Sequence, residues 1–112
     1  MSQVRVTYPT LNKDQVIERL GKTLPRLKRK LGVSKIILYG SYAQRRYTAG
    51  SDIDVIVVYE GEEKSDAYKL VVEEIGLPRL EPKIYTEEQF SLVMARSPKF
   101  AETIRKEGIV IT

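Results

Sequence analysis

Two aspartates are the residues of this sequence whose type and spacing best suit chemistry. Asp52 and Asp54 stand two positions apart at the start of an apolar run. On a strand, both carboxylates would point to the same face, roughly 7 Å apart along the chain. Like charges on one face repel unless a cation lies between them. Magnesium binds carboxylates and nucleotide phosphates and fits that gap, and a two-metal site holds its ions about 4 Å apart.

A Gly-Ser pair shortly before these aspartates supplies groups that bind phosphate. Gly40 ends a short β-branched run, and its missing side chain lets a phosphate approach the backbone. Ser41 adds a hydroxyl, and a helix that begins there would direct free N–H groups to the same point. Each feature alone is common in proteins. A Gly-Ser strand exit followed by Ser-Asp-x-Asp on a central strand is much more specific.

The composition excludes several kinds of active site. The 112-residue chain has no cysteine and no histidine, so a thiol nucleophile, a Ser-His-Asp triad and a histidine-ligated zinc are impossible within it. Any chemistry must use carboxylates, hydroxyls, lysines, arginines and bound metal. The formal net charge of +4 is compatible with a polyanionic ligand such as a nucleoside triphosphate, but it is weak support for nucleic-acid binding.

The length fits one domain, which we expect to span residues 1–112. The first residues lack the apolar stretch of a signal peptide, and the longest apolar run, 55–59, is too short to cross a bilayer. We therefore expect a cytoplasmic protein without a membrane partner. A basic cluster near the end of the first helical region is interpreted as a solvated face. It comprises Lys22, Arg26, Lys28, Arg29 and Lys30.

The first helical region begins after Asn12, at the start of a capping-box pattern. Apolar residues then recur at helical spacing as far as Gly32, which ends the helix. Gly21 and Pro25 interrupt this pattern. We therefore expect either a kink or two short helices, with Thr23 capping the second.

Strands and helices alternate in the rest of the chain. Strands are expected over 34–39, 52–59 and 80–85, with a short final strand over 109–112. Helices are expected as a short turn from Ser41, over 62–75, and as two later helices opened by Thr86 and by Ser97-Pro98. The 52–59 strand should be central, whereas Pro82 places the 80–85 strand at an edge or in a bulge. This order indicates an α/β sandwich with helices mainly on one face of a small sheet.

The segments 40–43 (Gly-Ser-Tyr-Ala) and 51–55 (Ser-Asp-Ile-Asp-Val) resemble the signature of the minimal nucleotidyltransferases, small members of the DNA polymerase β-like nucleotidyltransferase superfamily. The similarity covers most of the chain. It implies an α/β (α+β) fold with a small mixed β-sheet. It also implies transfer of a nucleoside monophosphate from a nucleoside triphosphate to a hydroxyl, with magnesium held by three carboxylates.

Carried over onto this sequence, the resemblance implies that Gly40 and Ser41 bind the triphosphate and that Asp52 and Asp54 hold magnesium. The third carboxylate of the family lies on a later strand, where Glu81 stands in the matching place. If that strand neighbours the Asp52 strand, Glu81 completes the catalytic, metal-binding set and is the natural base for an acceptor hydroxyl. The alternative interpretation is an ordinary edge-strand glutamate.

Two departures from the family pattern bear on activity. Glu81 replaces the usual aspartate. The family usually has Arg-Gly after Gly-Ser-x-Ala, whereas this chain has Gln44-Arg45 and so lacks a glycine beside the site. Together these departures leave room for a weakened or inactive enzyme.

The resemblance also implies a partner. Many small prokaryotic members are paired with a HEPN-domain toxin, for which they act as antitoxins, in some systems by attaching AMP to a toxin tyrosine. Two functions follow: a magnesium-dependent enzyme that transfers AMP from ATP to a HEPN toxin, or a catalytically weak antitoxin that acts by binding. A small-molecule acceptor such as an aminoglycoside is a third option. We expect a partner protein or a second copy of the chain to cover the open face of the sheet.

Overall fold

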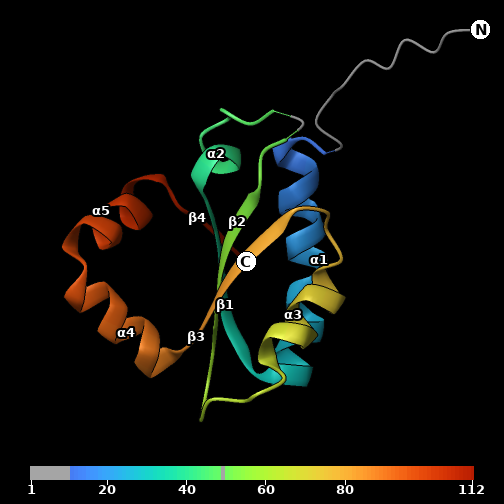
Figure 1. Ribbon diagram of the computed structural model, residues 1–112. Helices are drawn as coiled ribbons and strands as arrows, with labels where there is room; N and C mark the ends of the chain where they lie inside the picture. The colour runs from blue at the N-terminus through green and yellow to red at the C-terminus, as the bar shows by residue number, and fades with distance from the viewer. Residues whose placement is uncertain (1–10, 49) are drawn as a thin grey trace, which may run out of the picture.

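A four-stranded mixed sheet forms the middle layer of the computed structural model, which describes residues 11–48 and 50–112 (Figure 1). Its strands are β1 (Val33–Tyr39), β2 (Ile53–Tyr59), β3 (Leu80–Thr86) and β4 (Ile109–Ile111). The spatial order is β3-β2-β1-β4, with β1 antiparallel to β2 and β4, and β2 parallel to β3. The strand β2 is therefore central and β3 lies at an edge, as the apolar run and Pro82 predicted.

Helices cover both faces of this sheet. They are α1 (Lys13–Leu31), α2 (Gly40–Ala43), α3 (Ala67–Ile75), α4 (Glu87–Arg96) and α5 (Pro98–Glu107). In Figure 1, α1 and α3 lie on one side of the sheet and α4 and α5 on the other. The α+β class with a small mixed sheet is confirmed, but the helices are not mainly on one face. The reason is that Ile56 and Val58 point away from α1 and also need cover.

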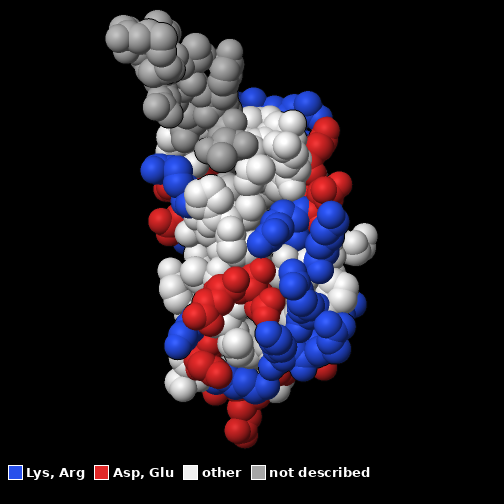
Figure 2. Space-filling model, turned by 90° about the vertical axis from the view of Figure 1, so that its right-hand side faces the viewer, with Lys and Arg blue, Asp and Glu red and all other residues white. Residues whose placement is uncertain are grey.

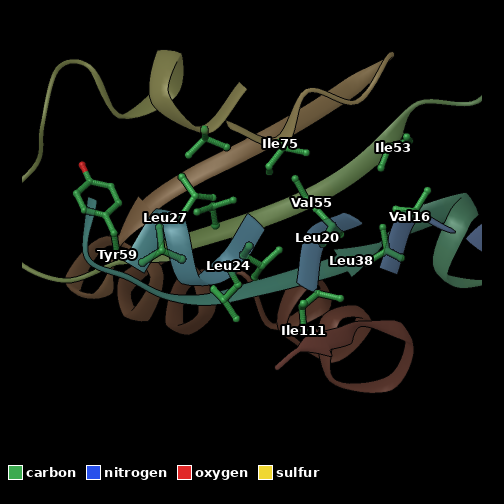
Figure 3. Packing of buried hydrophobic residues seen from close by; sticks show 14 of the residues in the cluster. Val16, Leu20, Leu24, Leu27, Leu38, Ile53, Val55, Tyr59, Ile75 and Ile111 are labelled. Carbon is green, nitrogen blue, oxygen red and sulfur yellow. The ribbon is translucent and has the colours of Figure 1, made fainter. Parts of the chain in front are cut away.

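The larger hydrophobic core lies between the sheet and the α1–α3 side (Figure 3). Alternation along β2 directs Ile53, Val55 and Val57 to this core. A stripe of α1 packs against them, and all its members are at most 5% exposed: Val16, Leu20, Leu24, Leu27 and Leu31. The core on the opposite face is smaller, and among the described residues α4 contributes no fully buried side chain to it.

The helix α1 is continuous, so the alternative of two short helices is wrong. The capping box is confirmed, because Asn12 Oδ1 accepts from the Gln15 N–H at 2.8 Å and Gln15 Oε1 accepts from the Asn12 N–H at 2.9 Å. The Thr23 hydroxyl caps no second helix but donates to the Arg19 carbonyl oxygen at 2.8 Å. Pro25 costs a helix about 3 kcal/mol. Burial of the α1 stripe, at about 1.5–3 kcal/mol for each large side chain, outweighs that cost.

Other boundaries differ by a few residues from those expected. The helix α3 begins at Ala67 rather than at residue 62, because the preceding loop is closed by a hydrogen bond from the Lys64 N–H to the Tyr59 hydroxyl at 2.8 Å. At α4, the expected capping box between Thr86 and Gln89 is present. Within residues 11–48 and 50–112, no helix is long and apolar enough to cross a membrane. Residues 1–10, where a signal peptide would lie, are outside the described residues.

The basic cluster of α1 lies on the α1–α3 side, which Figure 2 shows with basic and acidic side chains next to each other. Arg26 and Lys30 both contact Glu74 of α3, Arg26 at 3.7 Å. These contacts hold the pKa of Glu74 below its ordinary value, with the Lys30 hydrogen bond as the largest cause. Part of the cluster therefore joins α1 to α3 at the surface.

Gly21 offers a test of the continuous α1. A Cβ added there would meet no atom within 4 Å. Glycine inside a helix costs about 0.5–1 kcal/mol relative to alanine because of its greater freedom in the unfolded chain. We expect Gly21→Ala to raise the free energy of unfolding by about that amount in urea titrations. A decrease would contradict an uninterrupted helix at this position.

Candidate active site

The pairing of three strands places one carboxylate between two other polar side chains. Asp54 of β2 lies opposite Tyr39 of β1 and opposite Glu81 of β3. Side chains of directly paired residues project to the same face, so these three form a row across the sheet. The row lies on the face of α4 and α5. The condition for Glu81 as a third site residue, a strand adjacent to that of Asp54, is therefore met.

Asp52 lies just before β2 rather than on it. Its carboxylate is 48% exposed, and its Oδ1 is 3.2 Å from Nη2 of Arg79, the residue directly before β3. The backbones meet at the same point, because the Ile53 N–H donates to the Arg79 carbonyl oxygen at 2.8 Å. Sequence reasoning did not single out Arg79. Only its place before a strand parallel to β2 brings it to Asp52, and the parallel pairing is a tertiary feature.

Position 40 requires a glycine for two reasons, namely its backbone conformation and the close approach of the Asp54 side chain. Its φ is +74°, in the left-handed region that favours glycine. A Cβ at this position would overlap Oδ2 of Asp54 and would lie 3.2 Å from its Cγ. The glycine therefore leaves room for the Asp54 carboxylate to pack against the backbone. The approach of a phosphate to Gly40 stays a prediction.

The first turn of α2 follows directly. None of the described side chains caps this turn, so its first N–H groups remain available to a ligand. Ser41, in the first turn of α2 and half-buried, places its hydroxyl on the same segment. The structure thus brings Gly40, Ser41 and Asp54 together, as the motif spacing predicted.

The site has unusual electrostatics. Burial raises the pKa of Asp54 above its ordinary value, and the charges of Asp52 and Glu81 raise it further, while Lys83 lowers it. Burial also raises the pKa of Tyr39 to about 12, with the charge of Asp54 as the next cause. Tyr39 therefore keeps its proton at neutral pH and can donate a hydrogen bond but cannot act as a base.

The carboxylates of this site meet the ligand preferences of magnesium only in part. In the described stretches of the chain, no three side chains of the Asp, Glu, His or Cys type converge as a ready-made metal site. Magnesium, however, usually takes only one or two protein carboxylates and completes its shell with water and nucleotide phosphate. Asp52 and Asp54 supply two carboxylates, which suit an ion of that kind. The assignment of Glu81 as a third ligand stays a prediction.

In the loop after α2, Arg45 has a backbone conformation that is typical of glycine. Arg45 has a φ of +58°, which costs a residue with a Cβ roughly 1–2 kcal/mol. The neighbouring Gln44 donates from Nε2 to Glu107 of α5 at 2.6 Å. The departure from the family pattern therefore adds backbone strain beside the site.

Two tyrosines in this region have structural roles. Tyr42 and Tyr47 stack with ring centroids 4.2 Å apart. The Tyr42 hydroxyl donates to the Leu11 carbonyl oxygen at 3.0 Å, and the Tyr47 hydroxyl accepts from the Lys13 N–H at 3.1 Å. These contacts attach the loop to the start of α1.

Comparisons with known proteins agree with this geometry. The nucleotidyltransferase domain family matches residues 20–111. A proposed nucleotidyltransferase from Sulfolobus solfataricus is similar in structure, with a TM-score of 0.55 and 14% identity over 88% of this chain and 80% of that one. A search of curated proteins gave no match.

Two further solved structures are toxin–antitoxin proteins. A mutant of the toxin–antitoxin MntA-HpeT has a TM-score of 0.52 and 18% identity, over 91% of this chain and 73% of that one. A toxin–antitoxin with AMP-PNP has a TM-score of 0.51 and 16% identity, over 82% and 72%. At these identities the likeness shows the fold alone.

The raised pKa of Asp54 predicts that Asp54→Asn stabilises the protein at neutral pH. Because the folded state raises this pKa, folding favours the protonated carboxyl. The contribution of the Asp54 carboxyl to the stability of the fold is complete below the ordinary Asp pKa of about 3.9. It is lost as the pH rises through the higher pKa of the folded state. The asparagine of the variant stays neutral at every pH, so the variant does not lose this stability at neutral pH. Thermal unfolding should therefore give a higher Tm than wild type at pH 7, with a difference that shrinks below about pH 4.

Asp52→Asn is the matched control, because Asp52 is an exposed carboxylate with a cation beside it. Loss of such an ion pair changes stability by about 0–1 kcal/mol, and in the unfavourable direction. A lower Tm for Asp54→Asn than for wild type at pH 7 would show that Asp54 has a stabilising partner and would contradict the prediction.

Proposed function

Because the chain belongs to the nucleotidyltransferase domain family, we propose that it transfers AMP from ATP to a hydroxyl group in a magnesium-dependent reaction. The acceptor in this proposal is a tyrosine of a cognate HEPN-domain toxin, and the protein is its antitoxin. One observation carries the proposal: the half-buried Asp54 carboxylate packs against the left-handed Gly40 and lies in one row with Glu81. A phosphate group bound by the first turn of α2 would then lie next to a metal ion held by Asp54.

Each residue has a defined task in this reaction. Gly40 lets the triphosphate approach the backbone, and the Ser41 hydroxyl and the free N–H groups of α2 bind it. Asp52 and Asp54 hold magnesium, which when bound neutralises charge that develops on the transferred phosphoryl group. The acceptor oxygen forms a bond to the α-phosphorus, and the bond to the bridging oxygen breaks, so that pyrophosphate leaves. Glu81 accepts the proton of the acceptor hydroxyl.

The partner in this proposal is supported by analogy and by the fold. Two similar structures are toxin–antitoxin proteins, one of them with AMP-PNP. The HEPN class of the toxin rests on the resemblance of the motifs at 40–43 and 51–55. The α4–α5 face also has the smaller core, with Phe90, Met94 and Phe100 only partly buried. A partner on this face would lie next to the carboxylates.

The alternative function is an antitoxin that neutralises the same kind of partner by binding alone. The contact between Arg79 and Asp52 favours it, because a guanidinium already neutralises one of the two aspartates. The exposed position of Glu81 on an edge strand favours it as well. The two functions differ in whether Asp54 is needed.

Nucleotide binding gives the first test. A ligand that binds only the folded state stabilises it by RT ln(1 + [L]/Kd), about 2.7 kcal/mol at a hundredfold excess over Kd. Magnesium with ATP should therefore raise the Tm of the wild type. The double variant Asp52→Asn, Asp54→Asn should lose most of that increase. An equal increase in the double variant would place the nucleotide elsewhere.

Transfer of label from α-labelled ATP to the toxin gives the second test. Asp54→Asn should abolish transfer, and Glu81→Gln should leave on the order of one-hundredth, the usual cost of a lost general base. Glu18→Gln, which changes an exposed glutamate of α1 that is paired with Lys22 and lies on the other side of the sheet, is the control and should transfer at the wild-type rate.

Three outcomes of this experiment are informative. Transfer at the wild-type rate by Glu81→Gln would identify Glu81 as an ordinary edge-strand residue. Transfer by Asp54→Asn would refute the assignment of the site. If the wild type transfers nothing, and both it and Asp54→Asn neutralise the toxin in cells, the binding antitoxin is the correct function.

A further inference from the structure

Arg79 has a backbone conformation that its residue type disfavours. Among the described residues, only two other than glycine have a positive φ, namely Arg45 at +58° and Arg79 at +57°. A Cβ makes this left-handed region unfavourable, and glycine or asparagine would adopt it more readily. Strain of this kind at a site points to a role for the side chain.

The contacts of Arg79 show where that side chain acts. Its Nη2 lies 3.2 Å from Oδ1 of Asp52, and its carbonyl oxygen accepts the Ile53 N–H at 2.8 Å. Side chain and backbone thus both join the start of β3 to the start of β2. In the part of the chain that the structure describes, this is the one ion pair that includes a carboxylate of the site. Since both partners are about half exposed, the pair adds little stability.

We propose that Arg79 is the resident counter-ion of Asp52 and that it makes metal binding depend on nucleotide binding. This inference rests on the proposed function, because it concerns the same site. In the free protein the guanidinium occupies one oxygen of Asp52, so a divalent cation alone binds weakly. Arg79 is a positioning residue for the metal.

The physical reason is repulsion between two cations at one carboxylate. A magnesium ion would lie about 2.1 Å from its carboxylate oxygen, close to a guanidinium that already contacts Oδ1. Positive charges at such a separation repel appreciably even in water. A triphosphate removes this obstacle, because it offers the guanidinium a charge-assisted, bidentate partner and brings the metal its own phosphate ligands.

The test measures Mn²⁺ binding by calorimetry without nucleotide, at low ionic strength. We expect Arg79→Asn to bind Mn²⁺ about tenfold more tightly than the wild type, since one positive charge is removed from the site. Asparagine tolerates the left-handed backbone, which keeps the turn intact. Arg79→Lys retains the charge and should bind Mn²⁺ nearly as weakly as the wild type.

Arg45→Asn is the matched control. It makes the same change of charge at the same backbone conformation, but in the loop after α2. Because Arg45 makes no ion pair with a carboxylate of the site in the described residues, this change should raise the Mn²⁺ affinity by much less than Arg79→Asn. A non-hydrolysable ATP analogue should then raise the Mn²⁺ affinity of the wild type by a larger factor than that of Arg79→Asn, because only the wild type has a guanidinium to relocate.

Equal Mn²⁺ affinity in Arg79→Asn and wild type would overturn the proposal, as would an equal increase in Arg45→Asn, which would be an effect of net charge. If no variant binds Mn²⁺ even with the analogue, the metal site fails and the proposed function fails with it. If Arg79→Asn binds more tightly but the wild type transfers no label, only the enzymatic function fails. The Tm of each variant identifies any loss of folding.

Discussion

The carboxylate of Asp54 is a charge on the central strand of a small sheet, and much of the surrounding structure depends on that constraint. The rest of β2 is buried on both faces, so this position is only partly accessible to water. Burial raises the pKa of Asp54, and a second aspartate two residues away raises it further. A folded protein retains such a group when the charge is useful, because a neutral side chain would be more stable there.

The neighbours of Asp54 follow from this constraint. Gly40 contributes no side chain that would cover the carboxylate, at the cost of a left-handed backbone. Lys83 provides a positive charge on the same face that partly offsets the rise in pKa. Arg79 places a second positive charge next to Asp52 through a direct contact. Three carboxylates and two cations therefore lie in the region where the proposed function places a metal ion and a nucleotide.

The two faces of the sheet have different tasks. The face under α1 and α3 holds the larger core and provides most of the apolar burial. The other face carries the row of Tyr39, Asp54 and Glu81 and a smaller core beneath α4 and α5. Because polar side chains occupy part of this second face, it cannot be packed as fully. The same feature that leaves Asp54 partly accessible to water also leaves aromatic side chains on this face partly buried.

The sequence alone determined what depends on short-range interactions. Capping boxes at Asn12 and Thr86, the continuous apolar run of 52–59 and the position of Pro82 are features of short segments, so the elements that they predict were readable. The need for a glycine at position 40 was readable in the same way, whereas the phosphate-binding role expected of Gly40 and the metal-binding role expected of the two aspartates stay predictions. The sequence also shows that this chain lacks the family's glycine at Gln44-Arg45. It did not show that Arg45 would nevertheless take a left-handed backbone conformation.

Only the tertiary structure decided how distant segments meet. The parallel pairing of β2 with β3 sets Glu81 beside Asp54 and brings Arg79 to Asp52, although 27 positions separate each pair. The tertiary structure also decided that α1 is continuous through Gly21 and Pro25, because burial of its leucines outweighs the local preference for a break. Local patterns specify which residues can form a strand or a helix. The register between strands, and the face that each helix covers, follow from which apolar surfaces remain to be buried when the elements pack.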